Sequence, residues 1–431
     1  MKDAINVGLI GFGNIGTGVV QTLNNNGKLI DGRLSLPLKI TRIADIDLKT
    51  RRDADYDPAI LTDDAVSVVK DPDIDIIIEL IGGTGAARDI VEAALKNKKH
   101  VVTANKALLA KHGAELLNLA KENGVALLFE AAVGAGIPII RSMTYAFSAN
   151  RFKAVRGIMN GTTNYILTKM EREERSFDDV LSEAQELGYA EPDPTFDVEG
   201  YDTAHKLAIL ASLAFRQDIR INDVFVRGIT GVQQEDLASA REMGYTVKLL
   251  GITKQNDDDS VEVRVHPTLI PENSTLAAVS DAYNAIEVEG DPVGPQLLYG
   301  QGAGKGSTSS AILGDVMDIA RCIADGTGGP QPVKINVGEK KVTSMSDLET
   351  AYYIRMTLKD VPGMLAEVAS VFGEEKISIR SVLQRISDPG KFANAIFITH
   401  LAREGNIQNA LRNLKEKEIC KGTPFVLRVE F

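Results

Sequence analysis

The sequence predicts an α/β fold in which a doubly wound parallel sheet is followed by an α+β domain and a small ferredoxin-like βαββαβ domain. Three observations lead to this prediction. A glycine-rich turn, Gly11 to Gly16, joins the first strand pattern directly to the first helical pattern. Strand and helix patterns then alternate as far as about residue 130. From Ala351 onward the order is strand, helix, strand, strand, helix, strand.

Composition narrows the class of protein. The chain has 431 residues, which is enough for several domains, with 44% hydrophobic and 25% charged residues. A net charge of −11 disfavours nucleic acid or an anionic membrane as a partner, and we expect a small-molecule substrate from the motifs described below. No apolar run approaches the length of a membrane span. Cys322 and Cys420 are the only cysteines and lie far apart, so we expect a reducing, cytoplasmic environment.

The first 130 residues carry the pattern of a dinucleotide-binding domain. Helical patterns at 86–98 and 107–123 separate apolar strand patterns, and such alternation predicts a Rossmann-type parallel sheet with right-handed crossovers. Ligands of such sheets lie at the carboxyl ends of the strands. The expected strands are Ala4–Ile10, Leu38–Ala44, Ile74–Leu80, His100–Thr103 and Val125–Phe129.

A glycine motif between the first strand and the first helix predicts that a pyrophosphate is bound by backbone amides at the helix start. Its residues are Gly11, Gly13, Asn14, Ile15 and Gly16. Asp45 ends the second strand, where a carboxylate binds the ribose hydroxyls and favours NAD. Lys49, Arg51 and Arg52 follow closely and suit the 2′-phosphate of NADP, so the choice of cofactor stays open.

Further residues fall at the same edge of the predicted sheet. Thr84, Ala104, Lys106 and Glu130 each follow a strand pattern, which makes the first three candidates for the cofactor site. Lys106 is either a ligand-binding group or a solvated residue that begins a helix.

Residues 131–300 change to an α+β pattern, and we expect a substrate-binding and dimerisation domain there. Its centre is the stretch Glu191 to Leu210, in which a proline-rich acidic loop precedes a helix that Asp202 is suited to cap. Asp202, Lys206, Ile209 and Leu213 fall on one line of that helix. Asp202 and Lys206 have two interpretations. Either Asp202 caps the helix and forms a surface ion pair with Lys206, which contributes about 0.3–0.5 kcal/mol, or the two are a functional pair of charges that faces the interior.

The chain then returns to the first domain and ends in a separate module. Residues 301–330 contain a second glycine-rich loop, in which Gly304 is expected near the cofactor. This loop is not a phosphate-binding P-loop, because Gly306 rather than Ser or Thr follows Lys305. Residues 331–350 are interpreted as a linker, and 351–431 as the βαββαβ module.

Several motifs resemble one enzyme family. The run Glu191-Pro-Asp-Pro194 with Asp197, Gly200, Asp202 and Lys206-Leu207 is similar to the signature region of homoserine dehydrogenases. Thr103-Ala-Asn-Lys106 and Asn160-Gly-Thr-Thr-Asn164 resemble two further motifs of the family. The C-terminal module, with Asp360-Val-Pro-Gly-Met-Leu365 in its first turn, resembles an ACT domain. The resemblance covers essentially the whole chain and implies the monofunctional form.

The resemblance implies a reaction: the NAD(P)-dependent interconversion of L-homoserine and L-aspartate 4-semialdehyde, on the pathway to threonine, methionine and isoleucine. Lys206 would be the catalytic proton donor and Asp202 would orient it or contact substrate. Glu191 would take the substrate's ammonium group, and Lys106 its carboxylate or the cofactor.

The family also implies a cation and an effector. A sodium-like ion would be held by the carbonyl oxygens of Glu130, Val133, Ala135 and Ile137; the residues alone favour the alternative, a tight domain crossover. The ACT-like module would bind an amino acid, most simply L-threonine, and inhibit; alternatively it assists oligomerisation only. We expect a homodimer or homotetramer. The residues expected at the effector site are Asp360, Gly363, Met364, Leu365 and Gln384.

Two other functions are compatible with parts of the sequence. A semialdehyde enzyme that oxidises through a thioester needs a cysteine in the crevice, but Cys420 lies in the C-terminal module and Cys322 on an apolar helix. A catalytically silent amino-acid sensor needs no Glu191, Asp202 and Lys206, all of which are present.

Overall fold

The computed structural model describes residues 3–327, 329–330, 335–338, 340–388 and 392–430. Over this part of the chain, two compact units interleave along the sequence. The predicted domain limits near residues 130, 300 and 350 stay a prediction. The first unit comprises Met1–Val155, His205–Val224 and Asn284–Lys340, and the second comprises Arg156–Ala204, Phe225–Tyr283 and Lys341–Phe431.

The first unit is built on a parallel sheet with the strand order β3-β2-β1-β4-β5-β6. This order confirms the doubly wound fold, in which the strand sequence reverses between β1 and β4. The strands are β1 (Ile5–Ile10), β2 (Leu38–Ala44), β3 (Leu61–Thr62), β4 (Ile76–Glu79), β5 (His100–Thr103) and β6 (Leu127–Leu128). The helices are α1 (Asn14–Asp31), α2 (Ala65–Lys70), α3 (Ala86–Lys96), α4 (Lys106–Asn123), α5 (Ile139–Arg141) and α11 (Lys305–Ala324).

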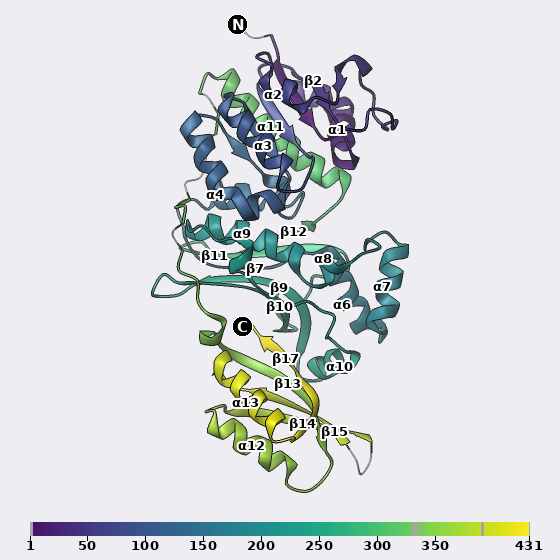
Figure 1. Cartoon of the computed structure of the whole chain (residues 1–431), viewed down its shortest axis with the longest axis vertical. Helices are drawn as coiled ribbons and strands as arrows, with labels where there is room; N and C mark the ends of the chain where they lie inside the picture. Colours follow the sequence, from purple (N-terminus) through teal and green to yellow (C-terminus); the bar gives the residue numbers. More distant parts are fainter. Residues whose placement is uncertain (1–2, 328, 331–334, 339, 389–391, 431) are drawn as a thin grey trace. The chain divides into compact units, whose positions relative to one another are not determined.

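Helix α11 returns to the first unit late in the chain, as the sequence predicts. It lies beside α1 (Figure 1), and its apolar residues, Ile312 and Val316 among them, join the core of the parallel sheet. The approach is close: a side chain on Gly18 of α1 would meet Lys305 and Ser309 at 2.6 Å. The strands β11 (Tyr283–Asp291) and β12 (Gly294–Gln301), which precede α11, are neighbours in a sheet.

The second unit contains a mixed sheet with the order β9-β10-β17-β13-β15-β14, in which β8 pairs with β10 and β16 with β13. Strand β7 (Arg151–Ile158) and helix α9 (Tyr201–Phe215) contain limits between the units. The other strands are β8 (Phe225–Val226), β9 (Tyr245–Gln255), β10 (Val261–Pro271), β13 (Glu349–Lys359), β14 (Ile379–Asp388), β15 (Phe392–Thr399), β16 (Ala402–Arg403) and β17 (Cys420–Val429). The helices are α6 (Gly161–Glu173), α7 (Phe177–Glu186), α8 (Thr195–Val198), α10 (Gln234–Glu242), α12 (Met364–Glu374) and α13 (Glu404–Glu416).

The C-terminal module has the predicted βαββαβ order. Its four long strands lie in the order β17-β13-β15-β14, and α12 and α13 pack against them (Figure 1). The core that they enclose includes Tyr352, Phe372 and Phe397. The module is joined closely to the rest of its unit. Strand β17 pairs in parallel with β10, and the buried Glu430 carboxylate lies 3.1 Å from the Arg264 guanidinium.

The sequence missed or shortened several strands. The sequence pattern indicates no strand for β9 or β12, and for β10 it indicates only the run Val261–Val265, although the strand continues to Pro271. Both β9 and β10 are almost wholly buried, so they lack the apolar–polar alternation that marks a strand with one solvated face. Within the described residues, no helix is both long and apolar enough to span a membrane.

Candidate active site

The glycine turn at the end of β1 is shaped by contacts that only glycine permits. Gly11 has a φ of 100°, and a Cβ there would lie 2.7 Å from the backbone of Leu80, which follows β4 across the switch point. A Cβ on Gly16 would lie 2.2 Å from the Gly11 carbonyl oxygen. Gly13, by contrast, faces open space and starts α1 without a side-chain cap. The first-turn amides of α1 therefore stay available to an anion.

Asp45 lies beside this turn, but its carboxylate already has partners. Its Oδ2 accepts a hydrogen bond from the Phe12 backbone N–H at 2.5 Å, and its Oδ1 accepts one from Asp47 N–H at 2.8 Å. The Arg52 guanidinium lies 3.5 Å from Asp45 and donates from Nε to the Phe12 carbonyl at 2.6 Å. Asp45 and Arg52 thus brace the glycine turn and also line the cleft next to it.

That cleft has a volume of about 550 Å³. It is lined by the start of α1, the end of β2 and Lys305, the first residue of α11, whose N-cap is Gly304. The predicted residues Gly13, Asn14 and Asp45 therefore line one opening, and the predicted Gly304 directly precedes Lys305, which lines it too. Charges of both signs line it: the acidic residues Asp45, Asp47 and Asp53 and the basic residues Arg51, Arg52 and Lys305.

The loops after β4 and β5 are tied to each other by a buried carboxylate that sequence reasoning missed. Glu79 accepts hydrogen bonds from the Thr103 hydroxyl at 2.7 Å and from the Ile81 N–H at 2.9 Å. Burial raises the pKa of the Glu79 carboxyl, against the effect of these hydrogen bonds. Asn105 donates to the Gly83 carbonyl at 2.7 Å. Thr84 and Ala104, which flank these residues, are thereby held at the same edge of the sheet.

Lys106 begins helix α4, and Asn105 caps that helix by accepting from the Leu108 N–H at 3.0 Å. The Lys106 side chain is half-buried. Both interpretations of Lys106 allow it to begin a helix, and its position at the sheet edge fits a ligand-binding lysine.

Asp202 and Lys206 lie one turn apart on α9, and both are buried, with 5% and 8% of their surface exposed. The prediction that Asp202 caps this helix is wrong, because the helix already begins at Tyr201. Instead, the Asp202 carboxylate accepts a hydrogen bond at 2.9 Å from the side-chain amide of Asn160. A surface ion pair is excluded by the burial of both residues, and charges so placed need a specific role or specific partners.

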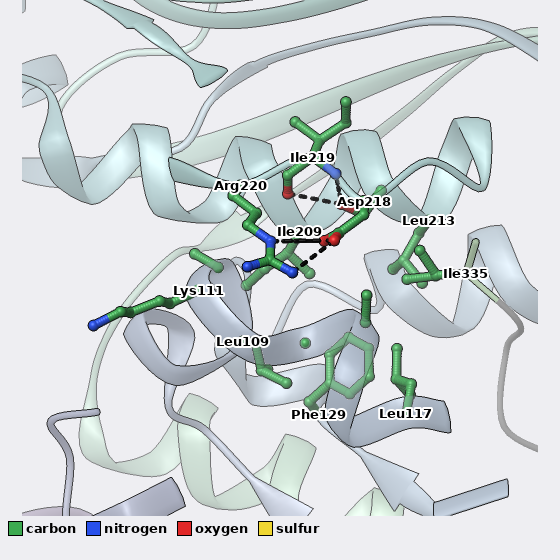
Figure 2. Close-up of a pocket in the computed structure, with 14 residues that line it drawn as sticks. Leu109, Lys111, Leu117, Phe129, Ile209, Leu213, Asp218, Ile219, Arg220 and Ile335 are labelled. Carbon is green, nitrogen blue, oxygen red and sulfur yellow. Dashed lines mark hydrogen bonds and ion pairs between the residues drawn. The ribbon is translucent and has the colours of Figure 1, made fainter. Parts of the chain in front are cut away.

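The side of α9 that carries Asp202 and Lys206 continues, towards the carboxyl end of the helix, into apolar residues that face the interior. Ile209 and Leu213 line a mainly apolar cavity between α9 and α4, together with Leu109, Leu117 and Phe129 (Figure 2). Arg220 closes one side of it with hydrogen bonds to Asp218 at 2.7 to 3.2 Å. None of the predicted catalytic residues lines this cavity. We interpret it as part of the apolar packing interface between α9 and α4, the helix that begins at Lys106.

Glu191 lies on the predicted acidic loop and is exposed. The loop backbone is held by Gln185, whose side-chain amide donates to the carbonyls of Glu191 at 3.1 Å and of Pro192 at 3.2 Å. The short helix α8 follows directly and leads into α9. A fixed backbone with a solvated carboxylate suits contact with a cationic group of a ligand.

The segment predicted to hold a cation has the backbone of a tight reversal. Gly134 and Ala135 both have positive φ, 71° and 47°. Glu130 anchors the segment, since its carboxylate accepts from Arg141 N–H at 2.7 Å and its own N–H donates to Asp315 at 2.8 Å. Such a backbone can turn carbonyl oxygens to one side, so the residues fit a hard cation. Across the described residues, no cluster of acidic, histidine or cysteine side chains with metal-binding geometry occurs.

The first turn of the C-terminal module borders an open cleft of about 410 Å³. Gly363 has a φ of 95° and starts α12 without a side-chain cap. Gln384 of β14 donates to Asp360 at 3.5 Å across the opening. The structure thus brings together all five residues predicted for the effector site: Asp360, Gly363, Met364, Leu365 and Gln384.

Comparison with known proteins identifies the same three parts of the chain that the sequence motifs indicate. The family model for homoserine dehydrogenase matches residues 138–317, its NAD-binding domain matches 11–130, and the ACT domain matches 352–418. The homoserine dehydrogenase of Bacillus subtilis is 40% identical over 428 residues, which are 99% of this chain and 98% of that protein.

The chain belongs to the homoserine dehydrogenase family. Its members are NAD(P)-dependent oxidoreductases. The homoserine dehydrogenase of Corynebacterium glutamicum is also 40% identical, over 99% of this chain and 96% of that protein. The crystal structure of a homoserine dehydrogenase from Thiobacillus denitrificans superimposes with a TM-score of 0.91 at 40% identity, covering 99% of this chain and 98% of that one. The Staphylococcus aureus homoserine dehydrogenase gives a TM-score of 0.78 at 35% identity, with 99% of each chain covered.

Proposed function

We propose that Lys206 is the proton donor and acceptor in the interconversion of L-aspartate 4-semialdehyde and L-homoserine, with Asp202 as its partner. Hydride arriving at the aldehyde carbon leaves negative charge on oxygen, which takes a proton from the Lys206 ammonium group. In the oxidative direction the neutral amine accepts that proton. The bound nicotinamide supplies or accepts the hydride. The observation that carries the proposal is the burial of both residues one turn apart on α9.

Asp202 serves this chemistry in two ways. Its negative charge, one helical turn away, partly compensates the cost of keeping the Lys206 ammonium group out of water. Its second oxygen is also suited to a hydrogen bond with the substrate hydroxyl.

Glu191 and Lys106 are assigned to the ends of the substrate. A carboxylate on a braced loop suits the α-ammonium group, and a lysine at the start of α4 suits the α-carboxylate or the cofactor. Lys106 lies at the helix end where backbone amides already favour an anion.

The dinucleotide is assigned to the glycine turn, with its pyrophosphate at the start of α1 and its ribose near Asp45. Thr84, Ala104 and Gly304 border the same edge of the sheet. We expect NAD to be used at least comparably to NADP, because Asp45 directly follows β2, where a carboxylate repels a 2′-phosphate.

A sodium-like ion is assigned to the carbonyls of Glu130, Val133, Ala135 and Ile137. It would supply a fixed positive charge that holds this segment in its reversed conformation. The Ile137 carbonyl also accepts from Ile139 N–H at 2.8 Å, which leaves its second lone pair for the ion.

An amino acid, which we take to be L-threonine, is assigned to the cleft at Gly363 as an inhibitor. Uncapped amides at the start of α12 suit its carboxylate, and the exposed Val361 and Leu365 suit its apolar part. The alternative, that the module serves oligomerisation alone, predicts no effect of added threonine. A homodimer or homotetramer and a cytoplasmic location are further parts of the proposal.

The two competing functions are less well supported. Cys322 is half-buried on α11, and burial raises the pKa of the Cys420 thiol, which makes it a poorer nucleophile. A silent sensor leaves the burial of Asp202 and Lys206 without a reason.

One measurement separates all three functions. The absorbance of reduced nicotinamide is followed with L-homoserine and NAD⁺ or NADP⁺, for the wild type and for the Cys322→Ser, Cys420→Ser double variant. The proposal predicts cofactor reduction by both proteins. A thioester mechanism finds no carbonyl in L-homoserine and predicts no reduction with it, but it predicts reduction by the wild type alone when L-aspartate 4-semialdehyde is supplied with the oxidised cofactor. A sensor predicts no reduction with either substrate.

A further inference from the structure

Asn160 lies at the start of α6 and is buried, with 5% of its surface exposed. Its side-chain oxygen caps the helix: Oδ1 accepts from the Thr163 N–H at 2.8 Å and from the Thr163 hydroxyl at 3.0 Å. This part of its role is ordinary, since asparagine, aspartate and serine cap helices about equally well.

The other end of the same amide faces two carboxylates. Nδ2 donates to Asp197 Oδ1 at 2.7 Å and to Asp202 Oδ2 at 2.9 Å. The amide has two hydrogens on this nitrogen and so provides one for each carboxylate. The orientation is chemically determined, because turning the amide over would set its N–H groups against the Thr163 N–H and its oxygen against two anions.

These bonds oppose a repulsion. Two carboxylates within reach of one nitrogen disfavour each other's charged form, and hydrogen bonds donated to the charged form offset that effect. Asp197 lies on α8, close after the acidic loop, whereas Asp202 lies on α9. The Asn160 side chain therefore connects three elements: the start of α6, α8 and α9.

We propose that Asn160 is a positioning residue for the reaction. Its amide nitrogen holds the Asp202 carboxylate in place, one helical turn from Lys206, and links that carboxylate to Asp197 by a second hydrogen bond. This rests on the role proposed above for Asp202 and extends it. Helix capping alone needs only the oxygen, so the amide nitrogen is the group that distinguishes asparagine from serine or aspartate at this position.

The test compares two replacements in the full chain. Asn160→Asp keeps the shape and the capping oxygen but replaces the donor by a third acceptor. Asn160→Ser keeps a good cap, adds no charge and loses the reach to Asp202. If the nitrogen matters, kcat falls by about tenfold for serine and further for aspartate, as expected when a reacting group is misplaced. The KM for the dinucleotide should stay within about twofold of wild type.

Ser176→Ala is the matched control. Ser176 caps α7 in the same unit by accepting from the Asp179 N–H at 3.2 Å, and it holds no carboxylate of the candidate site. For Ser176→Ala we expect a lower melting temperature with unchanged kcat, whereas Asn160→Ser should lose kcat. Should aspartate at 160 prevent folding, the serine variant and this control still decide the question.

A different ranking overturns the inference. If capping or shape is all that Asn160 provides, the isosteric aspartate will be the more active of the two variants. Asp202→Asn is measured alongside. Loss of activity in Asp202→Asn with normal activity in both Asn160 variants refutes only the positioning role. Normal activity in Asp202→Asn refutes the proposed role of Asp202 itself.

Discussion

Helices α1 and α12 begin in the same way, in two different units. Each follows the first strand of its βα sequence, and each has a glycine N-cap, Gly13 or Gly363, without a side-chain hydrogen bond to the first turn. Each borders an open cleft, with volumes of about 550 and 410 Å³. Both starts therefore present free backbone amides to an anionic group.

The two starts differ in how firmly the turn is held. At α1 the turn is closed by backbone contacts, since side chains on Gly11 or Gly16 would collide with the main chain at 2.7 and 2.2 Å. At α12 nothing lies within 4 Å of the Cβ position of Gly363, and Val361 and Leu365 are exposed. A braced turn suits a cofactor needed in every cycle. A turn with few contacts can change on binding, which suits an effector.

The largest expected effect falls on neither turn. We predict that Lys206→Ala lowers kcat by about 10² or more, the usual contribution of a general acid, with dinucleotide affinity near normal. Stopped-flow and steady-state measurements on the same preparation check both parts. Lys169→Ala is the control, because Lys169 forms an ion pair with Glu173 at 2.6 Å on the solvated side of α6. A turnover within a few fold of wild type for Lys206→Ala would make Lys206 structural.

Gly16→Ala tests the glycine turn at the start of α1. The added methyl must displace the Gly11 carbonyl, so we expect dinucleotide KM to rise by about tenfold or more and stability to fall by about 1–3 kcal/mol. Gly27→Ala, later in the same helix, meets no atom within 4 Å and should stabilise the protein by about 0.5–1 kcal/mol. Normal cofactor binding by Gly16→Ala would contradict the assignment of the pyrophosphate to this turn.

Local signals explain what the sequence predicted well. The glycine motif, the apolar strands and the inward line through Asp202 and Lys206 each depend on residues a few positions apart, and the structure contains all of them. The one error on that line concerns the helix start: the helix begins at Tyr201, two residues earlier than a cap at Asp202 would place it, and helix ends are the least certain part of such a prediction.

Pairings between distant residues account for what was missed. Glu79 meets Thr103 across 24 positions, and Asn160 meets Asp202 across 42. The joining of the C-terminal module to β10 depends on Arg264 and Glu430, which are 166 positions apart. Such contacts leave no periodic trace in one sequence, and only the fold brings them together.

The open turn at α12 is tested in the full chain, because removing the module would strip β17 from β10 and leave Arg264 buried without Glu430. We predict that Gly363→Val, strained at a φ of 95°, loses inhibition by millimolar L-threonine and keeps basal kcat within about twofold. Gly373→Ala on the same helix meets no atom within 4 Å and should keep the response. A wild-type enzyme indifferent to threonine would end the regulatory proposal.

The smallest effect expected is the choice of dinucleotide at the braced turn. We predict kcat/KM values for NAD and NADP within about tenfold of each other, since Asp45 repels a 2′-phosphate while Arg51 and Arg52 line the same cleft. Arg52 supports the turn through the Phe12 carbonyl, so Arg51→Ala is the cleaner variant. It should shift the ratio towards NAD by about tenfold or less, the size of one exposed charge contact. A preference for NADP of a hundredfold in the wild type would mean that the basic residues, and not Asp45, determine the pocket.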